Sequence, residues 1–222
     1  MKPIFVTGVE RSGTSMIAKI IAESGVFVGR TTKLMESLPV KRLLDTYYKN
    51  QGYDVHGQYP IPPRSNIMIP TDWRNNVEIV LRNEGMQEKG TFLLKSNRLS
   101  QTWRIWAYAF PEAQWIIIRR RTGDIIQSCL QTDYMDAYAN KDILDKLKVS
   151  DERDGWKWWI HQHEQYFVDM ITEGLDVKVI WPQRMVSGDY SQIYELYRWL
   201  GLTWKSKTTI QMIDKFLDKS RL

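Results

Sequence analysis

The chain has 222 residues and a mass of 26.3 kDa, with 43% hydrophobic and 26% charged residues. These values fit one folded domain over residues 1–222 and exclude wholesale disorder. A net charge of +5 favours anionic small ligands and argues against nucleic acid as a partner, because the positive excess is small. The single cysteine, Cys129, excludes an internal disulfide and a cysteine-rich zinc site.

The first two elements surround a short loop. Residues 4–7 are a β-rich run that stops at Gly8, which predicts a strand, and residues 15–23 carry isoleucines at helical spacing before Gly25. Because this strand begins so near the first residue, the sequence leaves no room for a signal peptide. No later stretch reaches the roughly 20 apolar residues that span a bilayer. We therefore expect a cytoplasmic protein with no membrane span.

The rest of the chain alternates between helices and strands. Helices are predicted over 34–49, 73–83, 102–110, from about 124 onward, and over 151–171, 191–200 and 207–219. Strands are predicted over 91–95, 114–119 and 177–181. Prolines predict a surface loop over 52–70, and residues 134–149 read as irregular or partly helical. This alternation predicts an α/β fold, a single three-layer domain with a central parallel sheet.

The loop between the first strand and the first helix has the sequence GVERSGTS, residues 8–15. Two glycines five positions apart let the backbone wrap around an anion, and the following helix offers free N–H groups and its positive end. The Walker A loop requires Lys where this chain has Thr14, so an ordinary ATP or GTP loop is disfavoured. Arg11 supplies the positive charge instead. The simpler interpretation is a tight turn with incidental glycines and hydroxyls.

A second pattern follows the strand over 114–119. The segment WIIIRRRTGDIIQSC, residues 115–129, places arginines at the carboxyl end of that strand. Ser128 follows Arg120 by eight residues, on the next helix. Because ligands of open α/β sheets collect at the carboxyl ends of the strands, we expect Arg120 to face the same edge as the first loop.

Together, the GxxRSGTS loop and the strand-Arg-x7-Ser pattern resemble the sulfotransferases that use 3′-phosphoadenosine 5′-phosphosulfate (PAPS). The likeness continues in FLLK at 92–95, FPEAQWI at 110–116 and the segment 181–202, which ends in WLGL. Arginine within the loop is more similar to the tyrosylprotein and bacterial branches than to the cytosolic small-molecule branch. The resemblance implies a P-loop-like nucleotide-binding architecture, with PAPS as co-substrate and no metal.

The resemblance also implies roles for particular residues. The first loop, with Arg11, Ser12, Gly13, Thr14 and Ser15, would hold the 5′-phosphosulfate, and Arg120 with Ser128 would hold the 3′-phosphate. Arg11 and Lys95 would stabilise charge on the leaving oxygen, by analogy with phosphoryl transfer. The family's late basic stretch is missing here, and Lys205 and Lys207 are its candidate substitutes.

An acceptor hydroxyl also needs a base. Cytosolic members have a catalytic histidine where this chain has Asn97, which takes no proton at neutral pH. Glu36 is the first candidate, since it resembles the acidic position that non-cytosolic members carry after the first helix, although it also reads as a solvated residue in a first helical turn. Glu10, in the loop, is the second candidate. His161 and His163 are two apart on a predicted helix and read as surface residues.

Several alternatives stay open at this point. The acceptor is a small molecule, a glycan or a peptide, and the loops over 52–70 and 132–149 are expected to frame its site and to become ordered on binding. The enzymatic alternative is a P-loop nucleoside or small-molecule kinase, which Thr14 disfavours. The non-enzymatic alternative is a catalytically silent nucleotide-binding protein, which the asparagine at position 97 favours.

Overall fold

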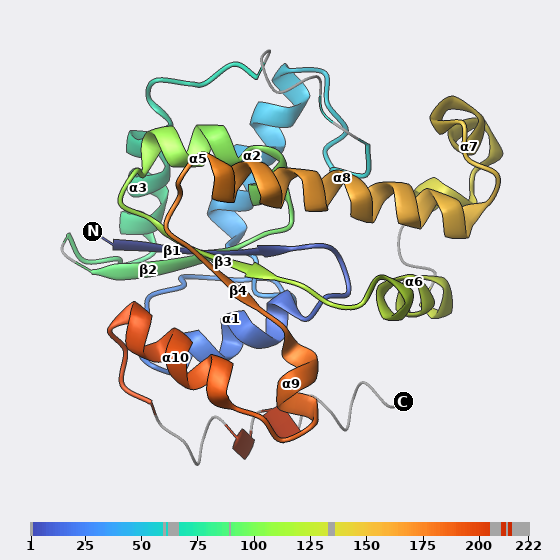
Figure 1. Ribbon diagram of the computed structural model, residues 1–222. Helices are drawn as coiled ribbons and strands as arrows, with labels where there is room; N and C mark the ends of the chain where they lie inside the picture. The colour runs from blue at the N-terminus through green and yellow to red at the C-terminus, as the bar shows by residue number, and fades with distance from the viewer. Residues whose placement is uncertain are drawn as a thin grey trace.

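Four parallel strands form the centre of the molecule (Figure 1). The structure, a computed structural model, describes residues 2–59, 61, 67–88, 90–132, 136–204, 210–211 and 213–214. The strands are β1 (Lys2–Gly8), β2 (Thr91–Lys95), β3 (Gln114–Ile118) and β4 (Val177–Ile180). They lie in the order β2-β1-β3-β4, and each neighbouring pair is parallel. The predicted α/β class with a central parallel sheet is confirmed.

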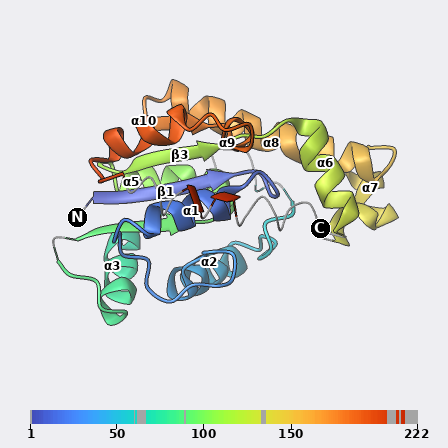
Figure 2. The ribbon, with the colours of Figure 1, turned by 90° about the horizontal axis from the view of Figure 1, so that it is seen from below.

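Helices cover both faces of the sheet and give the molecule three layers. Figure 1 shows α2, α3, α5 and α8 above the sheet and α1, α9 and α10 below it, and Figure 2 shows α6 and α7 beyond the carboxyl ends of β1 and β3. Their bounds are α1 (Thr14–Ala22), α2 (Leu38–Asn50), α3 (Trp73–Asn83), α4 (Arg98–Gln101), α5 (Trp103–Ala109), α6 (Thr122–Gln131), α7 (Lys141–Leu147), α8 (Glu152–Thr172), α9 (Pro182–Val186) and α10 (Ser191–Leu200).

The strand side chains explain why both faces need a cover. Successive residues of a strand point to opposite faces of a sheet. Phe5 and Trp115 accordingly pack into one apolar core, together with residues of α2, α3, α5 and α8, while Ile4 and Ile116 pack into the other, with residues of α1 and α10. All five residues of β3 are buried, as expected of a strand that is covered on both sides.

The predicted helix over 34–49 starts four residues later than expected, at Leu38. Met35 has a φ of 65°, which is outside the helical region, and Pro39 occupies the first helical turn, where proline is favoured. Glu36 therefore lies in a turn before the helix rather than within it, which corrects its expected place in a first helical turn.

Other boundaries differ less. The predicted helices over 73–83 and 191–200 and the strand over 91–95 have the predicted limits. The short helices α4 and α9 were not predicted, and residues 134–149 are partly helical, with a 3₁₀ turn (Asp136–Ala139) and α7. The loop over 52–70 has no helix or strand in its described part, residues 52–59, 61 and 67–70. Most of the predicted helix over 207–219 lies outside the described residues.

The long helix α8 corrects one prediction about its histidines. His161 is exposed, but His163 is fully buried, because its face of α8 packs against the core with Trp159 and Phe167. Trp156 and Trp159, near the start of this helix, are also fully buried. Burial lowers the pKa of the His163 imidazole, so this side chain is neutral near pH 7.

Candidate active site

The loop after β1 turns sharply before α1 begins. Arg11 has a φ of 61° and Gly13 one of 102°, both in the left-handed region. A residue with a β-carbon adopts this region at a cost, and such residues cluster at active sites and ligand-binding loops. The loop passes so close to β3 that a β-carbon on Gly8 would lie 2.6 Å from the carbonyl oxygen of Ile118. The N–H groups of Met16 and Ile17 donate to the Gly13 carbonyl oxygen at 3.1 and 3.3 Å, so α1 begins directly at the end of this compact loop.

The two predicted nucleotide motifs meet at the loop. Arg11 Nε donates a hydrogen bond to Ser128 Oγ at 2.9 Å, and Arg120 Nη1 donates to the Arg11 carbonyl oxygen at 3.0 Å. Ser128 belongs to α6, which lies beyond the carboxyl end of β3 in both views (Figures 1 and 2). The expectation that Arg120 faces the same edge as the first loop is confirmed. That this cluster binds a nucleotide stays a prediction.

The hydroxyl groups of the loop differ in their partners. Ser12 is 1% exposed, and within the described part of the chain its Oγ atom has no hydrogen-bond partner. Thr14 is also buried, whereas the Ser15 Oγ atom donates to the Leu34 carbonyl oxygen at 3.0 Å. A buried hydroxyl without a partner is costly unless a ligand satisfies it. The Ser12 hydroxyl, the helix end and Arg11 together fit a bound phosphate or sulfate.

A buried ion pair lies beside the loop at the end of β2. Lys95 Nζ is 3.6 Å from Glu36 Oε1, and the side chains are 3% and 20% exposed. Burial lowers the pKa of the Lys95 ammonium, while the carboxylates of Glu36 and Glu10 raise it in part. Both residues also line a small cavity between α2 and the end of β2, whose wall includes Lys41 and Arg98. The structure thus places the predicted base against the predicted lysine.

Glu10 is buried rather than solvated. Its Oε2 atom accepts a hydrogen bond from Trp159 Nε1 at 2.7 Å, and the residue is 6% exposed. The imidazole of His163 stacks edge-on against Trp159, with ring centroids 4.4 Å apart. Its Nε2 atom has no partner among the described residues. Sequence reasoning missed this contact between the loop and α8. Because Glu10 and Trp159 are 149 positions apart in the sequence, no local pattern could have indicated it.

The two segments expected to frame an acceptor site are joined. Tyr138, fully buried, donates a hydrogen bond from its hydroxyl to the Gln58 carbonyl oxygen at 2.7 Å. The neighbouring carbonyl of Gly57 accepts from Gln101 Nε2 at 2.8 Å, and that of Val55 accepts from Arg98 Nη1 at 2.7 Å. Residues 55–58 are therefore held by α4 and by the 3₁₀ turn. Their place in an acceptor site stays a prediction.

The remaining predicted residues are placed as follows. Asn97, at the position where the resemblance leads us to look for a histidine, has a buried Oδ1 atom with no partner in the described structure. Its carbonyl oxygen accepts a hydrogen bond from Thr7 Oγ1 at 3.4 Å, which places the residue beside the end of β1. Cys129 is fully buried, and burial raises the pKa of its thiol to about 12. Lys205 and Lys207 lie outside the described residues.

The described residues contain neither a cluster of metal-binding side chains nor a helix that could span a membrane. No three or more His, Cys, Asp or Glu side chains in these ranges are grouped so as to hold a metal ion. In the same part of the chain, no helix is both long and apolar enough to cross a bilayer.

The fold resembles that of two solved bacterial proteins. The chain superposes on sulfotransferase STF1 from Mycobacterium tuberculosis H37Rv with a TM-score of 0.55 and 13% identity, over 96% of this chain and 70% of the other. Sulfotransferase STF9 from Mycobacterium avium gives a TM-score of 0.55 and 13% identity, over 98% and 68%. No protein-family model and no curated protein sequence matches the chain. The chain therefore has a sulfotransferase fold. A fold shared at 13% identity does not show that the activity is shared.

Proposed function

We propose that this protein is a sulfotransferase that moves a sulfuryl group from PAPS to a hydroxyl or amine acceptor. The observation that carries the proposal is the contact between the two motifs: Arg11 bonds to Ser128, and Arg120 bonds to the backbone of Arg11. In a sulfotransferase fold, this cluster lies at the edge of the sheet where ligands of open α/β sheets bind. Arginine within the loop favours the tyrosylprotein and bacterial branches of the family.

The residues present fit the donor at its charged ends. Ser12, Gly13 and Thr14 would hold the 5′-phosphosulfate with backbone N–H groups and the buried Ser12 hydroxyl. Arg120 and Ser128 would hold the 3′-phosphate. PAPS supplies the sulfuryl group, and adenosine 3′,5′-bisphosphate is the leaving group. Such a ligand would compete for the contacts that Arg11 makes with Ser128 and that Ser15 makes with Leu34.

The ion pair at the end of β2 suits the transfer step. As the acceptor oxygen forms its bond to sulfur, the bond from sulfur to the phosphate oxygen breaks, and the acceptor proton passes to the Glu36 carboxylate. Lys95 and Arg11 stabilise the negative charge on the leaving phosphate oxygen. The burial of Lys95 strengthens this effect, because a charge in a water-poor site is weakly screened. No group on this route requires a metal ion.

Thermal melting with adenosine 3′,5′-bisphosphate, ADP, ATP–Mg²⁺ and GTP–Mg²⁺ in parallel tests the donor. At 100 times its dissociation constant, a ligand stabilises the folded state by about 2.7 kcal/mol, or about 5–10 °C for a domain of this size. We expect that shift with the bisphosphate alone. A shift with ATP–Mg²⁺, together with metal-dependent ATP turnover, would support a kinase instead.

Single substitutions locate the site. Arg11→Ala and Arg120→Ala should each remove most of the affinity for the bisphosphate in a calorimetric titration. The matched control is Arg82→Ala, which removes the same charge from an exposed pair with Glu78 on α3. Unchanged affinity in both site variants would contradict the assignment.

A panel of a phenol, a sugar and a tyrosine peptide, each supplied with PAPS, tests transfer. Glu36→Gln should lower the transfer rate by about 10²–10⁴-fold, the usual contribution of a general base, and leave bisphosphate affinity within a few fold. Glu10→Gln is the comparison, because Glu10 is the other buried carboxylate near Lys95. Normal bisphosphate affinity with no transfer to any acceptor would favour a silent binding protein.

A further inference from the structure

Residues 30–38 form a closed turn that carries Glu36. Thr31 and Ser37 pair as an antiparallel bridge, and Leu38 N donates to the Arg30 carbonyl oxygen at 2.9 Å. Inside this frame, Thr32 N donates to the Glu36 carbonyl oxygen at 2.8 Å. The main chain is therefore held on both sides of Glu36, whose side chain extends to Lys95.

The Thr32 hydroxyl stabilises the centre of the turn. Its Oγ1 atom accepts hydrogen bonds from the N–H groups of Leu34 and Glu36, both at 3.2 Å. Between these two residues, Met35 has a φ of 65°, a conformation that a residue with a β-carbon keeps only where its surroundings hold it. Removing the hydroxyl leaves both N–H groups without this acceptor and frees Met35 to leave the left-handed region.

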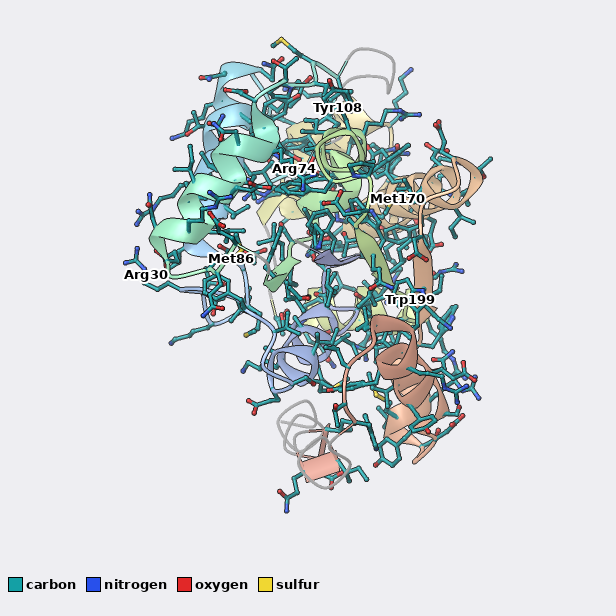
Figure 3. The ribbon with its side chains drawn as sticks, turned by 90° about the vertical axis from the view of Figure 1, so that its left-hand side faces the viewer. Arg30, Arg74, Met86, Tyr108, Met170 and Trp199 are labelled. Atoms are coloured by element: carbon teal, nitrogen blue, oxygen red, sulfur yellow. The ribbon has the colours of Figure 1, made fainter. Side chains whose placement is uncertain are left out.

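The turn is attached to the rest of the molecule at two further points. The guanidinium of Arg30 pairs with Glu84 at the end of α3, with 2.6 Å between Nη2 and Oε1, and Arg30 N donates to Glu84 Oε2 at 3.0 Å. Figure 3 shows Arg30 at the outer edge of the molecule, near Met86. On the inner side, Ser15 Oγ of α1 bonds to the Leu34 carbonyl oxygen at 3.0 Å. The turn therefore bridges α3 and the nucleotide loop.

We propose that Thr32 is a positioning residue, whose hydroxyl holds the turn in the shape that keeps the Glu36 carboxylate 3.6 Å from Lys95 Nζ. The inference rests on the proposed sulfotransferase function for its catalytic meaning, since Thr32 acts through Glu36. Its structural content, the placement of Glu36 against Lys95, is measurable without any reaction.

Lys95 reports the position of Glu36. Burial lowers the pKa of Lys95, and the carboxylates of Glu36 and Glu10 raise it. The cations of Lys41 and Arg98 line the same cavity. If the turn opens and Glu36 moves away, Lys95 loses one of its two carboxylate neighbours, and its pKa falls further. Glu10 stays in place, because it is held by Trp159 of α8.

The test compares Thr32→Val, which keeps the shape and removes the hydroxyl, with Thr32→Ser, which keeps the hydroxyl. Thr32→Ala is a second variant without a hydroxyl. Thr172→Val is the matched control, because the Thr172 hydroxyl also bonds to the main chain: it donates to the Val168 carbonyl oxygen near the end of α8. Each variant is titrated with adenosine 3′,5′-bisphosphate, assayed for transfer from PAPS to the best acceptor of the panel, and followed by NMR of ¹³C-labelled lysine through the titration of Lys95.

For Thr32→Val and Thr32→Ala we expect a transfer rate at least tenfold lower, bisphosphate affinity within threefold, and a lower pKa of Lys95. Thr32→Ser and Thr172→Val should match the unaltered protein in all three measurements. An unchanged Lys95 titration in both hydroxyl-free variants would overturn the inference, and so would an unchanged rate. If the unaltered protein neither binds the bisphosphate nor uses PAPS, the proposed function fails, and the Lys95 titration alone decides the role of Thr32.

Discussion

Adding one methyl group at Gly8 tests the packing on which the candidate site depends. A β-carbon there would lie 2.6 Å from the Ile118 carbonyl oxygen, 2.8 Å from Ser12 Oγ and 2.9 Å from Thr14 Cγ2. Real β-carbons stay beyond 3.0 Å from such atoms. The first of the three belongs to the backbone of β3, so no side-chain rotation relieves the contact, and β1 and β3 must separate or the loop must shift.

Overpacking of this kind costs about 1–3 kcal/mol. For a chain of this length, each kcal/mol lowers the melting temperature by about 2–4 °C, so Gly8→Ala should melt about 2–12 °C below the unaltered protein. Because two of the three crowded atoms belong to the loop that is proposed to bind the donor, the affinity of the protein for adenosine 3′,5′-bisphosphate should fall as well. Calorimetric melting and titration measure the two effects.

The control for this prediction is Gly123→Ala. Gly123 lies in the first turn of α6, has no positive φ, and has no heavy atom within 4 Å of the position of a β-carbon. Alanine is the better helix former by about 1 kcal/mol, so this variant should be as stable as the unaltered protein or slightly more stable. A Gly8→Ala protein that melts together with Gly123→Ala would refute the reasoning about close packing at the end of β1.

Three further substitutions test individual contacts by urea denaturation. Because burial lowers the pKa of His163, the unfolded chain binds a proton more readily than the folded protein does. The free energy of unfolding should therefore fall as the pH drops below about 6.5, by up to about 1.4 kcal/mol per pH unit. His163→Gln should remove this part of the pH dependence of stability. Trp159→Phe removes the donor to the buried Glu10 carboxylate and should cost about 1–3 kcal/mol, and an unchanged midpoint would contradict that role. Arg98→Leu leaves the Val55 carbonyl without its donor and should cost a similar amount, whereas Arg82→Leu, on the surface of α3, should cost less than 1 kcal/mol.

Most of the fold could be predicted because its signals are local. The β3 run WIII reads as a strand covered on both faces, and α3 and α10 have clear amphipathic periods, so their limits agree with the structure. The start of α2 could not be predicted from periodicity, because the apolar pattern continues back through Met35, which the backbone holds at a positive φ. That conformation depends on the hydrogen bond that Thr32 Oγ1 accepts from Glu36 N and on the one that Ser15 Oγ donates to the Leu34 carbonyl oxygen. Hydrophobic periodicity gives no sign of either bond.

In the candidate site, too, some contacts could be predicted from the sequence and others could not. The cluster of Arg11, Arg120 and Ser128 was predictable, since Arg11 and Arg120 each follow a strand end, Ser128 lies in the helix after β3, and parallel strands end at a common edge. The burial of Glu10 and His163 was not, because it depends on where α8 crosses the sheet. A charged or polar residue on a helix reads as a surface residue unless the partner that buries it is known.

The order of the strands is what brings the site together. β1 lies between β2 and β3, with Val6 opposite Lys95 in one register and Gly8 opposite Ile118 in the other. The loop after β1 is therefore flanked by the lysine that ends β2 on one side and by the arginines that follow β3 on the other. Exchanging β1 with either neighbour would keep every local motif intact but would move the loop after β1 away from Arg120 in one case and away from Lys95 in the other. The chemistry proposed here thus follows from the topology as much as from the loop sequence, because no single segment contains both the group that holds the donor and the pair that acts on the acceptor.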